Sequence, residues 1–149
     1  MHLFQPEADI HLNHLMQNYL TIKKMVGAAK IMAVVKANAY GHGAVPIAHV
    51  LSDVGVLGFC VALAKEAEEL IAADISEPIL HLGKISASSI DLYQSGQVRC
   101  SINSVKDVNI LEKNGSEKTP FFAHLKIDTG MGRLGIKIEN YHFILQKLA

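Results

Sequence analysis

A single lysine stands where an apolar run meets a turn that contains two glycines. The run from Ile31 to Val35 has the length and valine content of a buried strand, and Lys36, Gly41 and Gly43 follow it. A lysine at such a strand end has its stem packed in hydrocarbon and its amine close to a water-poor pocket, where desolvation lowers the pKa. The neutral amine can then act as a nucleophile or a base, as Schiff-base lysines do. The alternative is a lysine that simply extends its ammonium group into water.

A second group of polar side chains lies in the segment 121–128, which reads as a strand. Because strand side chains alternate, one face carries Ala123, Leu125 and Ile127, and the other carries Phe122, His124, Lys126 and Asp128. If the apolar face meets helices, the polar row lies inside the fold, where it must be paired or functional. The alternative is an exposed edge strand with one solvated face.

Two further side chains lie close to these segments. Arg133 follows the polar strand in a run containing three glycines, residues 130–135, where its guanidinium offers a rigid fork of donors to a carboxylate or phenolate oxygen. Tyr40 lies four residues after Lys36. Taken alone, an arginine in a loop is more often a surface charge, and the tyrosine reads equally as a packing residue.

The elements that would position these side chains repeat along the chain. Strand-like runs begin near Ile31, Leu57, Pro78, Val98 and Phe121, and each is followed by sequence with helical periodicity. An apolar stripe within residues 12–20 predicts a helix before the first strand. The helix after the second strand has a polar face that includes Glu66, and Ser104 with Asp107 resembles a capping box after the fourth strand. Repeated βα units give either an open doubly wound sheet or a closed (β/α)8 barrel.

Composition excludes several classes of function. Lys plus Arg equals Asp plus Glu, at 14 each, so no basic surface for nucleic acid is expected. No apolar stretch is long enough to span a membrane and the N-terminus does not read as a signal peptide, so we expect a cytoplasmic protein. Cys60 and Cys100 fall inside predicted strands, as buried reduced thiols do. We expect no metal site, because His11 and His14 have no carboxylate or thiolate at metal-site spacing.

Two motifs resemble those of one enzyme family. VVKANAYGHG, residues 34–43, is similar to the pyridoxal-phosphate attachment motif of alanine racemases, and KIDTGMGRLG, residues 126–135, is similar to the family's second hallmark. The resemblance implies an α/β fold of the TIM-type (β/α)8 barrel class. Residues 1–149 would be an incomplete N-terminal part with about five βα units, and the family's C-terminal β-domain would be absent. Five strands cannot close such a barrel, so the first and last strands would have unpaired edges.

The resemblance also implies an activity and roles for individual residues. It implies pyridoxal 5'-phosphate as cofactor and alanine as a small-molecule substrate, whose L and D enantiomers are interconverted. Lys36 would hold the cofactor as a Schiff base and act as the catalytic base for the D-enantiomer. Tyr40 would bind the cofactor phosphate, and Arg133 would contact the substrate and the cofactor's ring oxygen. Lys126 matches a lysine that is often carbamylated and holds the nearby arginine.

The resemblance leaves the activity of this chain open. In the family the opposite base is a tyrosine of the C-terminal β-domain, contributed across a homodimer interface, and the sequence is expected to end before that domain. One alternative is a non-catalytic barrel that binds pyridoxal phosphate, like the single-domain vitamin-B6 homeostasis proteins, although their lysine motif lacks the Tyr-Gly-His-Gly continuation. Another is an inactive truncated fragment.

Overall fold

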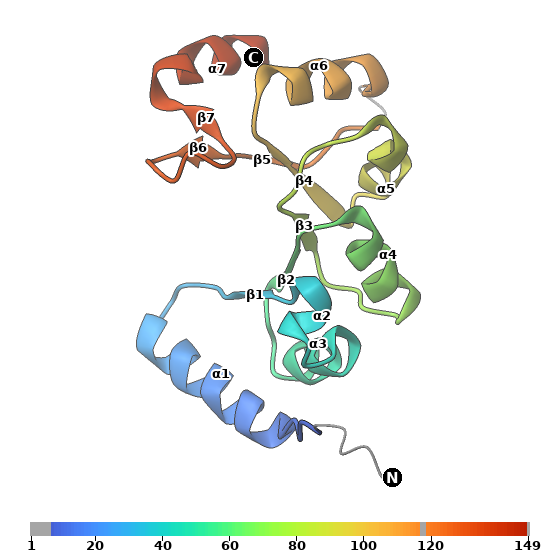
Figure 1. Cartoon of the computed structure of the whole chain (residues 1–149), viewed down its shortest axis with the longest axis vertical. Helices are drawn as coiled ribbons and strands as arrows, with labels where there is room; N and C mark the ends of the chain where they lie inside the picture. The colour runs from blue at the N-terminus through green and yellow to red at the C-terminus, as the bar shows by residue number, and fades with distance from the viewer. Residues whose placement is uncertain (1–6, 117–118, 149) are drawn as a thin grey trace, which may run out of the picture.

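Five parallel strands form the sheet of this protein, and most of its helices lie on one side of that sheet (Figure 1). The computed structural model describes residues 7–116 and 119–148. The strands are β1 (Met32–Val34), β2 (Gly58–Val61), β3 (Ile79–His81), β4 (Val98–Ile102) and β5 (Ala123–Leu125). They pair in chain order, β1-β2-β3-β4-β5, and each neighbouring pair is parallel.

Helices connect successive strands, as the repeated βα pattern predicts. They are α1 (Leu12–Val26) before β1, α2 (Lys36–Tyr40) and α3 (Ala44–Asp53) after β1, α4 (Ala64–Ala72) after β2, η1 (Ala87–Ser89) and α5 (Ile90–Gln94) after β3, and α6 (Val105–Asn114) after β4. The predicted cap of α6 is confirmed, because the Ser104 hydroxyl accepts a hydrogen bond from the backbone N–H of Asp107 at 3.4 Å. Among the described helices, none has the length and apolar content that a membrane span requires.

The order of the strands decides between the two expected architectures. A doubly wound sheet reverses its strand order at one point and carries helices on both faces. Here the strand order never reverses. The connecting helices all lie on the same side of the sheet, namely α3, α4, α5 and α6 (Figure 1). The structure is therefore an incomplete (β/α)8 barrel, which confirms the expected fold class.

The hydrophobic core lies between the sheet and these helices. Residues paired in register share a face of the sheet, and the face toward the helices carries buried side chains: Phe59, Val61, Ile79, Val98, Cys100 and Ile102. Both cysteines are free and buried in strands, as predicted, and burial raises the pKa of the Cys100 thiol to about 11. The opposite face, which would line a barrel, carries Ser101 beside His124.

The first strand is less buried than its apolar sequence predicts. β1 spans only Met32–Val34, and the Val34 side chain is 43% exposed, whereas Val35 just beyond it is buried. The reason is that β1 is an edge strand, paired with β2 alone. The expectation of a fully buried strand from Ile31 to Val35 was therefore wrong.

The segment 121–128 forms two strands in place of the single strand expected. β5 ends at Leu125, and β6 (Ile127–Asp128) pairs in parallel with β7 (Ile136–Lys137) in a separate sheet, followed by η2 (Ile138–Asn140) and α7 (Tyr141–Leu148). Lys126 joins the two sheets: its N–H donates to Ile102 O at 3.0 Å, and its carbonyl accepts from the N–H of Ile136 at 2.8 Å. Both its backbone groups are thereby paired, and the strand changes partner at this residue.

A buried histidine on β3 predicts how stability depends on pH. His81 is 3% exposed, and burial lowers its pKa. Below about pH 6.5 the unfolded chain binds a proton at His81 that the folded chain excludes. The free energy of unfolding should therefore be constant above about pH 6.5 and decrease as the pH falls from there to the lowered pKa of the folded chain, by at most about 1.4 kcal/mol per pH unit. Urea unfolding between about pH 5 and 7 measures this slope. The slope should flatten in His81→Leu and persist in His49→Leu, which changes an exposed histidine; an equal slope in both variants contradicts the assignment.

Candidate functional site

Lys36 lies at the carboxyl end of β1. The last hydrogen bond between β1 and β2 runs from Val35 N–H to Cys60 O at 3.0 Å, and the chain leaves the sheet at the next residue. In parallel barrels this end of the strands is the one that carries functional groups. The Lys36 side chain is half-buried, so its amine lies at the rim of the sheet, outside the hydrophobic core.

The turn that follows Lys36 is left-handed. Residues 37–40 have φ between 51° and 55°, although none of them is glycine. Such a conformation costs an L-residue roughly 1 to 2 kcal/mol, so the surrounding structure must hold it. The Ala39 N–H donates to Val35 O at 2.8 Å, and the Asn38 side chain accepts from the N–H of Ala44 at 2.7 Å. A strained, braced turn beside a lysine is typical of a functional site.

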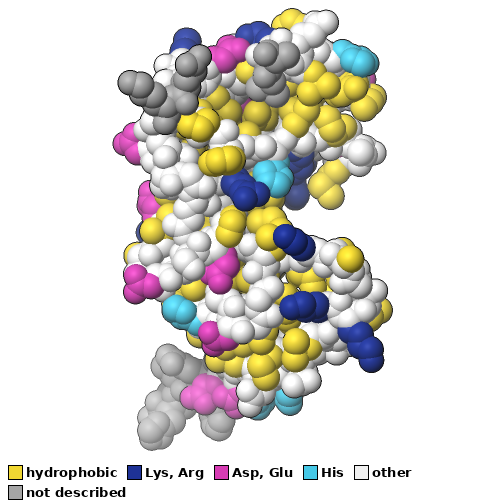
Figure 2. Space-filling view, turned by 180° about the vertical axis from the view of Figure 1, so that it is seen from behind, with side chains coloured by type: hydrophobic (Ala, Val, Ile, Leu, Met, Phe, Trp, Pro, Cys, Tyr) yellow, Lys and Arg dark blue, Asp and Glu magenta, His cyan; other side chains and the backbone are white. Residues whose placement is uncertain are grey.

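One cavity brings three of the four predicted site residues together. Lys36, Lys126 and Arg133 line a space of about 260 Å³. Figure 2, which views the molecule from behind, shows a hollow on the open side of the sheet with Lys and Arg side chains around it. The remaining lining residues lie at and beyond the ends of β2 and β3 and in the glycine-rich loop: Ala62, Leu82, Gly83 and Leu134. We call this space the lysine pocket; its described lining has three cationic side chains and no carboxylate.

Tyr40, the fourth predicted residue, lies beside the lysine pocket and does not line it. Its ring centroid is 5.9 Å from the Lys36 Nζ atom, within range of a cation–π contact. Its side chain is 60% exposed. The phenol is therefore free to turn toward a ligand held at Lys36.

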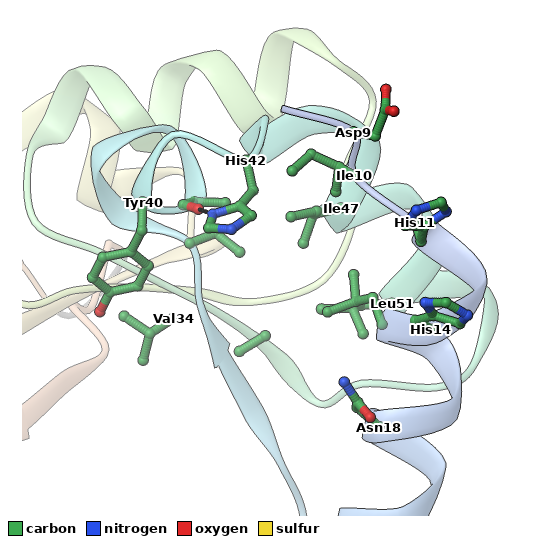
Figure 3. A pocket seen from close by; sticks show the side chains of 14 residues that line it. Asp9, Ile10, His11, His14, Asn18, Val34, Tyr40, His42, Ile47 and Leu51 are labelled. Atoms are coloured by element: carbon green, nitrogen blue, oxygen red, sulfur yellow. Dashed lines mark hydrogen bonds between the residues drawn. The ribbon is translucent and has the colours of Figure 1, made fainter. Parts of the chain in front are cut away.

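A larger, mostly apolar cavity of about 510 Å³ lies on the other side of the turn. Figure 3 shows Tyr40 and Val34 at one side of this cavity. At the other side are His11, which precedes α1, and His14 and Asn18 of that helix. The rings of His11 and His14 are 5.0 Å apart between centroids. Within residues 7–116 and 119–148 there is no cluster of three His, Cys, Asp or Glu side chains that could hold a metal ion.

The loop that carries Arg133 is held by a carboxylate. Asp128 accepts hydrogen bonds from the backbone N–H groups of Gly132, at 2.9 Å, and Gly130, at 3.0 Å. These bonds, that of Gly132 first, hold the pKa of the Asp128 carboxyl below its usual value. Beyond Arg133, a side chain at Gly135 would meet the backbone N of Asp128 at 2.8 Å, and the φ of Gly135 is +118°, so only glycine fits there. Both ends of the loop are thus fixed against β6.

Removing the Asp128 carboxylate is expected to loosen this loop. In Asp128→Ala the N–H groups of Gly130 and Gly132 lose their acceptor, so their amide hydrogens should exchange faster with solvent. In the unaltered chain the same loss should appear only at acid pH, as the pH falls through the lowered Asp128 pKa, below 3.8. Amide exchange followed by NMR measures both effects. Asp91→Ala, on α5, is the control; unchanged exchange at Gly132 in Asp128→Ala contradicts the prediction.

Sequence reasoning missed two features of this site. The left-handed turn at residues 37–40 has no signature, because Ala37 and Ala39 have no intrinsic preference for positive φ. The role of Glu66 was also missed: its carboxylate accepts a hydrogen bond from the Ala37 N–H at 2.7 Å. Its place three residues into the helix after β2 was the available signal, because a glutamate there can reach back to backbone N–H groups.

Comparison with known proteins identifies the family. Residues 10–149 match the family model described as "Alanine racemase, N-terminal domain". The chain is 43% identical over 133 residues to the alanine racemase of Desulforamulus reducens, which covers 86% of this chain and 35% of that protein. It is 40% identical over 142 residues to the catabolic alanine racemase of Pseudomonas putida, covering 95% of this chain and 39% of the relative.

Solved structures agree with this result. The alanine racemase of Bacillus anthracis with bound L-Ala-P superposes with a TM-score of 0.84 at 32% identity, over 92% of this chain and 36% of that one. The complex of the Clostridium difficile enzyme with cycloserine gives a TM-score of 0.83 at 30% identity, over 91% and 38%. The chain thus spans about 30 to 40% of the length of the curated relatives it matches. It belongs to the alanine racemase family, within the N-terminal domain.

Proposed function

We propose that this chain binds pyridoxal 5'-phosphate covalently through Lys36 and takes part in interconverting L-alanine and D-alanine. The observation that carries the proposal is the lysine pocket, in which Lys36 meets Lys126 and Arg133 although it precedes both by 90 or more residues of sequence. Membership of the alanine racemase family supports the same reading, since alanine racemases are pyridoxal phosphate enzymes.

The residues present fit this cofactor. Pyridoxal phosphate is a small anion with an aldehyde, and the pocket offers an amine to the aldehyde and two further cations to the negative oxygens. A volume of about 260 Å³ is close to the lower end of the range for small-molecule sites, roughly 300 Å³. Once bound, the cofactor supplies an electron sink for negative charge at the substrate's α-carbon.

Each side chain has a proposed task. The Lys36 Nζ atom would hold the cofactor and would move the α-proton of the D-enantiomer. The Arg133 guanidinium donates to the substrate carboxylate and to the cofactor's ring oxygen. Tyr40, exposed beside Lys36, donates its hydroxyl hydrogen to the phosphate.

Lys126 is proposed to act through Arg133. The two side chains share the lysine pocket, and among the described residues no carboxylate lies within salt-bridge distance of either. Carbamylation would convert the Lys126 ammonium into an anion, which accepts hydrogen bonds from the Arg133 guanidinium and removes the repulsion between two cations. In this role Lys126 orients the arginine and takes no part in proton transfer.

A second candidate function is cofactor binding without racemisation. It is favoured by the pocket itself, because Lys36 is the one lining residue that we assign as a base, whereas racemisation needs a base on each face of the substrate. In the complete family protein we propose that the opposite base comes from a partner subunit. We also propose a cytoplasmic location, because the two cysteines are free and buried.

Borohydride reduction after incubation with pyridoxal phosphate tests the common part of both functions. It fixes the cofactor permanently on the lysine that carries it, and peptide mapping then identifies that lysine. Labelling of Lys36 in preference to every other lysine is the result that the proposal requires.

A further inference from the structure

The carboxylate of Glu66 connects the ends of two strands. Its Oε1 atom accepts from the N–H of Ala37 at 2.7 Å, and its Oε2 atom accepts from the N–H groups of Ala62, at 2.8 Å, and Leu63, at 3.0 Å. Ala37 follows Lys36 directly, and Ala62 follows the last residue of β2. The helical pattern places Glu66 on the polar face of α4. Its position three residues into the helix separates it from the other glutamates of that face, and in the structure its carboxylate turns back onto the sheet.

The far end of this connection is fixed in the core. The carbonyl of Ala62 accepts from His81 Nε2 at 3.0 Å, and His81 Nδ1 is 2.7 Å from the Tyr93 hydroxyl, which donates to it. His81 and Tyr93 are 3% and 0% exposed. The peptide groups on both sides of Ala62 are therefore held, its N–H by Glu66 and its carbonyl by His81. Glu66 thus fastens the strained turn beside Lys36 to a rigid point.

The arrangement uses both carboxylate oxygens as acceptors. Three backbone donors converge on two oxygens, and a carboxylate accepts on both. The amide of glutamine has one oxygen and one NH₂ group, so it must face at least one of these N–H groups with another donor. Glu66→Gln therefore breaks one half of the connection while it changes the size of the side chain very little.

We propose that Glu66 is a positioning residue that holds the Lys36 turn so that the Lys36 amine enters the lysine pocket in the orientation required for covalent attachment. This inference rests on the proposed function of Lys36. Glu66 does not line the pocket, although it holds the N–H of the lining residue Ala62, and in our assignment it does not touch the cofactor. It acts on the reaction through the backbone that it holds, at Ala37 beside Lys36 and at Ala62.

The test measures the initial rate at which pyridoxal phosphate attaches to Lys36. The amine adds to the aldehyde carbon, water leaves, and borohydride delivers hydride to the resulting C=N bond, so the trapped product reports each attachment. In Glu66→Gln we expect this rate to fall by about 10- to 100-fold, the range for a misplaced reacting group. Labelling of the exposed Lys30 should not change and serves as the internal reference. Glu68→Gln, an exposed neighbour on α4, is the matched control and should behave as the unaltered chain.

A second readout is independent of the cofactor. The Ala37 amide hydrogen should be protected from exchange in the unaltered chain and in Glu68→Gln, and should lose protection in Glu66→Gln. If the unaltered chain attaches the cofactor at Lys36 and Glu66→Gln does so at the same rate, the positioning role is overturned. If the unaltered chain does not label Lys36 at all, the proposed function fails, and with it the attachment role of Glu66, while protection at Ala37 still decides whether Glu66 holds the turn.

If Glu66→Gln does not fold, the unaltered chain and Glu66→Asp still test the positioning role of Glu66. An Ala37 amide that exchanges as fast in the folded chain as in the unfolded chain shows that Glu66 does not hold the turn. Protection lost at Ala37 in Glu66→Asp, whose shorter side chain cannot span both strand ends, supports the proposal. Circular dichroism establishes that each preparation is folded before either measurement.

Discussion

Lys36→Ala is expected to abolish site-specific attachment of pyridoxal phosphate. In the unaltered chain, reduction with borohydride should place the label on Lys36 in preference to Lys126, because Lys36 lies at a strand end where a braced turn presents its amine to the lysine pocket. Without that amine no covalent bond can form there. Mass spectrometric peptide mapping of the reduced protein measures the label at each lysine.

Two controls make this experiment specific. Lys30→Ala removes an exposed lysine close in sequence and should leave the label at Lys36 unchanged. Pyridoxine 5'-phosphate, which has the phosphate but no aldehyde, should give no trapped product in any variant. Label spread evenly over the exposed lysines of a folded preparation would show that the turn at Lys36 does not create a reactive site.

The second large effect concerns the two enantiomers of alanine. The chain loaded with pyridoxal phosphate is expected to exchange the α-hydrogen of D-alanine for solvent deuterium about 10²- to 10⁴-fold faster than that of L-alanine, which is the usual contribution of a general base. The reason is that Lys36, the base assigned to the D-enantiomer, is present in the lysine pocket, whereas no other lining residue is assigned to the opposite face. Proton NMR in deuterium oxide follows each enantiomer separately.

This measurement distinguishes partial from complete catalysis. Exchange of D-alanine with retention of configuration is the expected result, and it should disappear in Lys36→Ala but persist in Lys30→Ala. Equal exchange rates for the two enantiomers, or conversion of one into the other, would show that the chain supplies a base on both faces. That outcome would contradict the assignment of Lys36 as the single base in the pocket.

The sequence alone predicted most of the secondary structure and the elements of the site. Period-two and helical patterns predicted five strands and the helices between them because burying one face of an element requires apolar residues at that spacing. The same patterns misjudged β1, whose apolar run suggested complete burial. Burial depends on what covers a strand, and β1 is an edge strand with one partner.

The sequence also determined which side chains could carry chemistry, since the two motifs single out Lys36, Tyr40, Lys126 and Arg133. Only the tertiary structure decided how they meet. Parallel pairing in strict order brings the carboxyl ends of β1 and β5 to one rim of the sheet, which places Lys36 and Lys126 in the same pocket. The tertiary structure also decided the left-handed turn and its hydrogen bond to Glu66. Alanine has no preference for positive φ, so hydrogen bonds around the turn must hold it, and the one from Ala37 to Glu66 joins residues 29 positions apart in sequence.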